Sequence, residues 1–433
     1  MEVPDVSYAR SGDVAIAYQV FGEGPADLVF LPFLSNLYTL WEFERWGRFC
    51  ERLAVGRRII LINPRGVGLS DRTRGFTVES RVDDIRAVID AEGVERVPLL
   101  AIADSAATSA VFAASYPDRV ERLLLFNPVR RGVAPEDRDE ALKQLNEERD
   151  TWGRREQLET MARESNPQWA DDREFIESFV RHHRLTSSPG TWLEFRRMTI
   201  DLDVTDVLPA IRVPTLVMVK ERTRALGAEV AERIKGSQLA ILPGEGLAIF
   251  ENEFALEAIE AFLAGAPQQM IPDSVLVTLL FTDLVGSTER AAELGDRGWR
   301  ELLSSHHEIV RRELARFRGV EIDTAGDGFF ATFDGPARAI HAARAIVAGI
   351  ERLGLRARAG VHTGECELHD GKVAGIAVST GARVSAAAAS GEVLVSSTVK
   401  DLVAGSGIEF DVRGPHELKG VSGEVQLYAV LDA

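Results

Sequence analysis

The chain contains 433 residues, more than a single hydrophobic core usually organises, so two or more domains are expected. It is 45% hydrophobic and 27% charged, as globular proteins are, and its longest apolar runs are too short to cross a bilayer. Its net charge of −17 argues against nucleic acid or an anionic membrane as a general partner, although a local metal-bearing pocket still admits an anionic nucleotide.

The first residues and the cysteines bear on location. "MEVPDVSYARSGD" lacks the basic segment and apolar stretch of a signal peptide, so none is expected. Cys50 and Cys366 are too far apart in the sequence to form a metal-binding spacing or a disulfide framework. These features predict a cytoplasmic protein without a membrane span.

Residues 1–264 alternate short apolar runs with helical stretches. This pattern predicts an α/β domain whose mostly parallel sheet is covered on both faces. Between about 134 and 200 the apolar runs stop, and a polar segment with Trp and Arg predicts a helical cap inserted into the domain. The predicted strands are "VAIAYQVFG", "DLVFLPF", "RRIILINP", "VPLLAIA", "ERLLLFNP", "TLVMVK" and "QLAILPG".

One strand, tight turn and helix, "LLAIADSAATSAVFAASYP", lies where an α/β-hydrolase carries its G-x-S-x-G nucleophile turn. Together with "RSGDVAIAYQVFGEGPADLVFLP", "PRGVGLSD" and "AASYPDRVERLLLFNP", it resembles the α/β-hydrolase superfamily over residues 7–264. The positions that the resemblance assigns to catalysis are degenerate. Ala103 stands at the serine position, and Thr223 and Leu247 stand at the positions of the acid and the histidine, so hydrolase activity is not expected.

An alternative nucleophile in this domain is Ser105, with His182 or His183 as its base. Nothing in the sequence orients a base toward Ser105, so we interpret it as a structural helix residue and the two histidines as a solvated pair. Two roles for the domain are left open. Its pocket could sense a small apolar ligand, or the domain could serve as packing and dimerisation surface.

The segment "AGAPQQMIPDS" is small, polar and proline-containing, and we assign a linker to residues 265–274. Residues 275–433 then follow the order β, helix, two β, helix, β, which predicts a ferredoxin-like α+β domain. The first strand is "SVLVTLLFTDLV", and "GVEIDTAGDGFFATF" predicts a hairpin that turns at residues 326–328. The helices are "WRELLSSHHEIVRRELARF" and "ARAIHAARAIVAGIERL", and "RARAGVHTGEC" is the next strand.

Two carboxylates are predicted to meet in this domain. Asp283 ends the first strand and Asp327 lies at the tip of the hairpin, and these elements are neighbours in a ferredoxin-like sheet. Two hard oxygen anions suit Mg²⁺ or Mn²⁺, whose coordination is completed by water and substrate phosphates. Gly286, Ser287 and Thr288 follow Asp283 and offer backbone N–H groups at a helix start, where phosphate oxygens are stabilised.

Several long motifs of this domain resemble the class III nucleotidyl cyclases over nearly all of residues 275–431. They are "FTDLVGSTERAAELGDRGWRELL", "DTAGDGFFATFDGPARAI", "RAGVHTGE", "GARV" and "HELKGV". A hydrolase-like domain followed by such a cyclase is similar to an arrangement found among actinobacterial proteins. The resemblance implies conversion of ATP to 3′,5′-cyclic AMP and pyrophosphate, with two divalent ions, Mg or Mn, in each active site.

The same resemblance implies a role for each site residue. Asp283, Asp327 and the backbone carbonyl of Leu284 would bind metal, Arg383 would stabilise charge on the α-phosphate, and Lys419 would hold the terminal phosphates. In this family the metal-binding aspartates come from one chain, and the arginine, the lysine and the base-reading residues from the other. A homodimer would therefore be required for activity.

Three positions depart from the family pattern. Asp323 replaces the lysine that reads adenine, Lys372 replaces the matching aspartate, and Ser379 replaces an asparagine that orients the ribose or the transition state. The first two changes exchange charges, and the third predicts a slower enzyme because a serine hydroxyl reaches less far. Three alternatives follow: an adenylyl cyclase, a cyclase that accepts GTP, and a catalytically silent nucleotide-binding dimer.

Overall fold

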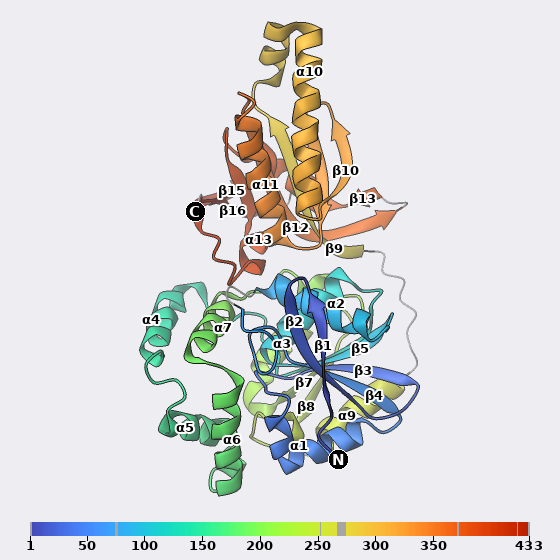
Figure 1. Cartoon of the computed structure of the whole chain (residues 1–433), viewed down its shortest axis with the longest axis vertical. Helices are drawn as coiled ribbons and strands as arrows, with labels where there is room; N and C mark the ends of the chain where they lie inside the picture. The colour runs from blue at the N-terminus through green and yellow to red at the C-terminus, as the bar shows by residue number, and fades with distance from the viewer. Residues whose placement is uncertain are drawn as a thin grey trace. The chain divides into compact units, whose positions relative to one another are not determined.

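The chain forms two compact units, residues 1–272 and 273–433 (Figure 1). The computed structural model describes residues 2–73, 77–251, 253–265, 274–369, 372–421 and 423–431. Most of the predicted linker, residues 266–273, therefore lies outside the described residues. No helix in the described ranges is both long and apolar enough to cross a membrane.

The first unit is an α/β-hydrolase fold built on an eight-stranded sheet of order β1-β2-β4-β3-β5-β6-β7-β8. The pairs β1-β2 and β2-β4 are antiparallel. The remaining pairs, along β4-β3-β5-β6-β7-β8, are parallel, as the apolar runs predicted. The edge strand β1 was not predicted, because its side chains are largely exposed and give no apolar run. The strands are β1 (Val6–Ser11), β2 (Val14–Phe21), β3 (Ala26–Leu31), β4 (Arg57–Ile62), β5 (Val97–Ile102), β6 (Val120–Phe126), β7 (Thr215–Lys220) and β8 (Gln238–Leu242).

Helices cover both faces of this sheet. α1 and α9 contact each other and share an aromatic core that includes Phe30, Trp46 and Phe49. α2 and α3 also contact each other, and they pack against β1 and β5, respectively. Four further helices, α4 to α7, form the cap between β6 and β7, where the rings of Trp152 and Trp192 stack at 3.8 Å. The α-helices are α1 (Glu44–Leu53), α2 (Val78–Ala91), α3 (Asp104–Ser115), α4 (Arg138–Glu148), α5 (Arg155–Ser165), α6 (Arg173–Thr186), α7 (Pro189–Asp201), α8 (Arg224–Ala231) and α9 (Glu253–Ala264).

Short 3₁₀ turns complete the unit. They are η1 (Thr39–Glu42), η2 (Pro135–Asp137), η3 (Pro167–Trp169), η4 (Leu208–Ala210), η5 (Glu221–Thr223) and η6 (Ile249–Glu251).

The second unit has a sheet of order β10-β11-β9-β12-β14-β16-β15, with β13 paired to β12. Its first four strands are antiparallel and give the predicted ferredoxin-like order, and β14 extends the sheet in parallel to β12. The strands are β9 (Ser274–Leu284), β10 (Val320–Ala325), β11 (Gly328–Phe333), β12 (Ala357–His369), β13 (Lys372–Ala374), β14 (Val393–Ser396), β15 (Phe410–Glu417) and β16 (Glu424–Val430).

The helices of this unit divide between the two faces of the sheet. α10 (Ser287–Arg316) and α11 (Pro336–Glu351) contact each other and bury one face, with Leu280 and Ala331 in the shared core (Figure 1). α12 (Ile376–Ala387) packs on β12 and β9, and α13 (Ser397–Leu402) follows β14. Because side chains alternate along a strand, Phe281 and Asp283 point to the face opposite that of Leu280.

Candidate active site

The structure brings Asp283 and Asp327 together. Asp283 is the penultimate residue of β9, and Asp327 lies in the turn between β10 and β11. The amide of Leu284 donates a hydrogen bond to Asp327 Oδ2 at 3.3 Å. A Cβ placed on Gly328, next to Asp327, would lie 4.0 Å from Asp283 Oδ1. The Asp283 carboxylate therefore borders the turn that carries Asp327. The predicted neighbourhood of the two carboxylates is therefore present within one chain.

A side chain of α10 contacts the turn that carries Asp327. Gly326 has φ of 64°, a conformation that glycine adopts without steric cost. His307 lies with Nε2 2.9 Å from the carbonyl oxygen of Gly326, and since that oxygen can only accept, the ring N–H donates. Beside it His306 packs on Phe329, and burial lowers the pKa of His306 to about 4, so it is neutral at pH 7.

A residue that the sequence did not single out, Arg358, contacts the site. Arg358 lies opposite Asp283 in the β12–β9 pairing, and its Nη2 is 2.8 Å from Asp283 Oδ2. Its Nη1 also donates to the carbonyl oxygen of Ala386, in the last turn of α12, at 3.1 Å. Arg358 thus connects a site carboxylate to α12. Only the strand register could have revealed this pairing in advance.

The oxygen atoms at the site fit a divalent cation. One oxygen of Asp283 is held by Arg358 and one oxygen of Asp327 by the Leu284 amide; the described residues give neither Oδ1 atom a hydrogen bond. No group of three or more His, Cys, Asp or Glu side chains suited to a metal occurs in the described ranges. A cation held by Asp283 and Asp327 would therefore take its remaining ligands from backbone, water or substrate, as Mg²⁺ commonly does.

The segment after Asp283 begins a helix, as predicted. Gly286 is the residue before α10, with φ of 72°, and Ser287 is the first helical residue. The first amides of α10 therefore follow β9 within a few residues, and an anion at this helix start would be stabilised by unpaired N–H groups. The side chain of Thr288 lies outside the described residues.

Arg383 and Ser379 lie on exposed positions of α12, and Lys419 is exposed in the turn between β15 and β16. Among the described residues, Arg383 and Lys419 make no hydrogen bond or ion pair with Asp283 or Asp327. Direct contacts within one chain therefore link Asp283 and Asp327 to the β9 end but do not include Arg383 or Lys419.

The placement of α12 depends on glycine. A Cβ on Gly360 of β12 would lie 2.2 Å from the backbone nitrogen of Ser385, and one on Gly381 of α12 would lie 2.9 Å from the Phe281 ring. Real Cβ atoms do not approach other atoms so closely, so the helix and the strand can pack at this separation only with glycine at both positions. This packing sets the position of Arg383, which is carried on the same turn as Ser385.

The two exchanged residues lie on different strands. Asp323 is exposed on β10, and its Oδ1 accepts a hydrogen bond from the Thr324 amide at 2.9 Å. Lys372 is the first residue of β13 and pairs with His369, but its side chain lies outside the described residues. Their role in reading the base stays a prediction.

The sheet face that carries Asp283 is partly open and apolar. The rings of Phe281 and Phe330 stack at 4.5 Å, and both are only partly buried. Ile376, the first residue of α12, is 74% exposed, the highest exposure among the large exposed apolar residues that the structure describes. Phe281, Phe330 and Ile376 are thus three large apolar side chains that the described residues do not fully cover.

In the first unit, Ala103 lies in the tight turn between β5 and α3 and has a positive φ. Ala103 has φ of 52° and ψ of −117°, a conformation that is strained for a residue with a Cβ. The Thr223 hydroxyl donates to Asn127 Oδ1 at 2.7 Å, and the Leu247 amide donates to the Ser165 carbonyl oxygen at 2.8 Å. Neither residue supplies an acid or a base to the turn.

Ser105 is held in a buried polar cluster. Its hydroxyl donates to the Pro32 carbonyl oxygen at 3.0 Å and accepts from Arg81, which also pairs with Asp104 at 2.7 Å. Burial raises the pKa of Asp104, although the Arg81 charge opposes this shift. These contacts favour a structural role for Ser105.

The prediction that His182 and His183 are solvated was wrong. They are 4% and 8% exposed, because α6 turns them into the aromatic core of the cap, and burial lowers their pKa values to about 3 and about 4. His182 Nδ1 contacts the hydroxyl of Thr39 at 2.7 Å, and His183 Nδ1 contacts the Phe179 carbonyl oxygen at 2.9 Å. In the described residues, neither ring makes a hydrogen bond with Ser105.

Comparison with known proteins agrees with this division into two folds. The family described as the adenylate and guanylate cyclase catalytic domain matches residues 271–432. An uncharacterized protein of Rhizobium meliloti is 31% identical over 178 residues, which are 36% of this chain and 17% of that protein. The pH-sensitive adenylate cyclase of Mycobacterium tuberculosis is 29% identical over 224 residues, which are 47% of this chain and 55% of that protein.

The first unit has its own structural relatives. The enol-lactonase from Burkholderia xenovorans LB400 aligns with a TM-score of 0.52 at 21% identity, covering 59% of this chain and 99% of that one. At this identity the likeness concerns the fold alone.

Proposed function

From a C-terminal adenylate and guanylate cyclase catalytic domain joined to an α/β-hydrolase fold, we propose that the chain converts ATP to 3′,5′-cyclic AMP and pyrophosphate. The observation that carries the proposal is the meeting of Asp283 and Asp327 at the end of β9, next to the first amides of α10. The two carboxylates and the helix N-terminus together suit a metal-bound triphosphate. GTP as an alternative substrate rests on Asp323 and Lys372.

In the proposed reaction the ribose 3′ hydroxyl attacks the α-phosphate and pyrophosphate leaves. Divalent ions, when bound, lower the pKa of the hydroxyl and neutralise the leaving charge. Asp283 and Asp327 would hold these ions, with the backbone carbonyl of Leu284 as a further ligand, and Arg358 would keep the Asp283 carboxylate oriented. Arg383 stabilises the charge that develops on the α-phosphate, Ser379 orients the substrate through its hydroxyl, and Lys419 holds the terminal phosphates.

The proposed site is completed by a second copy of the chain. Arg383 and Lys419 are exposed and make no contact with the aspartates in the described residues of one chain. The open face that holds Phe281, Phe330 and Ile376 is an apolar surface on which a second cyclase domain can pack. Together these observations support a homodimer that shares two sites.

The Ile376→Asp variant tests this surface. A carboxylate at the centre of an apolar interface would be buried without a partner, so we expect the dimer to weaken by at least about tenfold and turnover to fall with it. Analytical ultracentrifugation gives the dissociation constant. The control is Val412→Asp, since Val412 is 64% exposed on β15 and outside this face. Equal dimerisation of Ile376→Asp and the wild type would refute the assigned surface.

The double variant Asp323→Lys with Lys372→Asp tests which purine is read. Guanine presents N–H donors to Asp323 and the O6 acceptor to Lys372, whereas adenine suits the reverse pair. If these side chains contact the base, the double variant should shift kcat/KM toward ATP, because unpaired polar groups in a site discriminate strongly. An unchanged ratio of ATP to GTP efficiency would mean that neither residue touches the purine.

A different class of function, a silent nucleotide-binding dimer, is the alternative. It is favoured by Ser379 and by the exchanged pair, while the joint presence of Asp283, Asp327, Arg383 and Lys419 favours the enzyme. The deciding experiment incubates the purified chain with Mn²⁺ or Mg²⁺ and either ATP or GTP, and identifies the product by mass spectrometry. Cyclic AMP is the expected product; nucleotide binding without any cyclic product would establish the silent dimer.

We propose that the first unit is not a hydrolase. Short-chain nitrophenyl esters should show no turnover by the wild type, and Ala103→Ser should not restore it, because Leu247 supplies no imidazole to activate a serine. The assay follows nitrophenolate release, with Ser105→Ala as the matched control. A burst that Ser105→Ala abolishes would contradict this assignment.

A further inference from the structure

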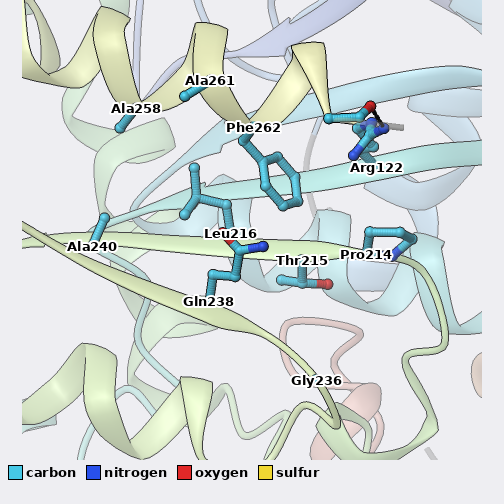
Figure 2. Close-up of a pocket in the computed structure, with 11 residues that line it drawn as sticks. Arg122, Pro214, Thr215, Leu216, Gly236, Gln238, Ala240, Ala258, Ala261 and Phe262 are labelled. Carbon is cyan, nitrogen blue, oxygen red and sulfur yellow. Dashed lines mark hydrogen bonds between the residues drawn. The ribbon is translucent and has the colours of Figure 1, made fainter. Parts of the chain in front are cut away.

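A cavity of about 400 Å³ lies in the first unit between one face of the sheet and α9 (Figure 2). Its floor includes Thr215 and Gln238, the first residues of the parallel strands β7 and β8, whereas Ala103 follows the carboxyl end of β5. The cavity is thus at the edge of the sheet opposite the degenerate hydrolase turn. Its volume is within the range of small-molecule sites.

A buried cation, Arg122 of β6, forms one end of this cavity. Arg122 is 4% exposed, its guanidinium lies 5.4 Å from the centre of the Phe262 ring, and its Nε has no hydrogen-bond partner among the residues that the structure describes. Nη2 donates to the carbonyl oxygen of Gly265, and Glu121 Oε1 lies 3.7 Å from Nε. Buried polar N–H groups are costly without a partner, so an acceptor in the cavity would stabilise this side chain.

The other residues that line the cavity indicate the chemistry of the part of a ligand that does not contact Arg122. Leu216, Ala240, Ala258 and Phe262 present apolar surface between the sheet and the helix. The Thr215 hydroxyl donates to the Val213 carbonyl oxygen at 2.9 Å, so toward the cavity it can only accept. An acid with a carboxylate at the Arg122 end and an apolar body against Leu216, Ala258 and Phe262 therefore matches this lining, with Gln238 as a further polar contact.

We propose that this cavity binds a small apolar carboxylic acid, with its carboxylate on Arg122 and its body against Leu216 and Phe262. Gly265 directly follows α9, at the point where the chain leaves the first unit toward β9. Arg122 would contact both the ligand and the Gly265 carbonyl oxygen. Ligand binding in the cavity would therefore change the strength of the Arg122–Gly265 hydrogen bond. The ligand then regulates the cyclase domain, a consequence that rests on the proposed function.

Binding is measured on the full chain by isothermal titration calorimetry with phenylacetate and the neutral, similarly shaped phenylacetamide. Phenylacetate should bind saturably and at least about tenfold more tightly than the amide, because it makes charge-assisted hydrogen bonds to a desolvated guanidinium. Arg122→Gln should abolish the preference for the anion. Ala258→Leu should reduce the binding of both compounds by filling the cavity while leaving Arg122 in place.

The control is Arg119→Gln, since Arg119 pairs with Asp90 outside this cavity and its loss removes the same charge. Arg119→Gln should bind phenylacetate as the wild type does. Absence of saturable phenylacetate binding, equal affinity for the amide, or unchanged binding by Ala258→Leu would each overturn the site. Because calorimetry does not depend on turnover, these outcomes are separable from a failure of the proposed cyclase activity; a change of cyclase rate on adding phenylacetate tests regulation in turn.

Discussion

Replacing Asp283 by asparagine is expected to lower cyclic nucleotide formation by at least about a hundredfold, because a charged ligand is removed from the point where transition-state charge is neutralised. The amide keeps the shape of the side chain but also leaves Arg358 without its 2.8 Å carboxylate partner. Turnover is measured with Mn²⁺ and ATP, and circular dichroism reports whether the variant is folded.

The matched control for this variant is Asp411→Asn. Asp411 lies on β15 and pairs with Arg413, so the same change of charge occurs far along the sheet order from β9. Activity of Asp411→Asn should stay near that of the wild type. Near wild-type turnover by Asp283→Asn would remove the carboxylate pair from the mechanism.

The second large effect is expected for Gly360→Ala. The added methyl group would lie 2.2 Å from the backbone nitrogen of Ser385, so α12 must move away from β12 and take Arg383 with it. Overpacking of this kind costs about 1–3 kcal/mol of unfolding free energy. We expect a turnover loss larger than the stability loss alone explains, since the variant still folds but misplaces Arg383.

Chemical denaturation and steady-state kinetics on the same preparation separate these two effects. Gly47→Ala is the control, because Gly47 lies within α1 and a Cβ there meets no atom within 4 Å. That substitution should be neutral or slightly stabilising, as alanine is the better helix former. If Gly360→Ala retains wild-type turnover, α12 is not positioned by this contact.

The carboxylate pair could be predicted because its determinants are local in sequence. A strand that ends at Asp283 and a tight glycine turn at Asp327 are each visible in a few residues, and the ferredoxin-like order makes them neighbours. The same reasoning predicted the parallel strands of the first unit, whose apolar runs are long enough to identify. Short sequence patterns were therefore sufficient to predict the main strands of both units.

Arg358 and the buried histidines could not be predicted in the same way. The contact of Arg358 with Asp283 depends on the register of β12 against β9, which joins residues far apart in the sequence. His182 and His183 sit in a polar stretch of sequence, yet the cap packs them against Phe43 and Phe179. Register and tertiary packing are set by the whole fold, and a short motif does not encode them.

Two copies of the chain are proposed to share each active site. This sharing is tested most directly by mixing Asp283→Asn protein with Arg383→Ala protein and measuring cyclic AMP formation. Each variant alone should be inactive, and the mixture should recover up to about a quarter of wild-type turnover, since half of the dimers formed by random exchange would be mixed and each would hold one intact site. A mixture as inactive as its components, with mixed dimers shown to form, would contradict a shared site.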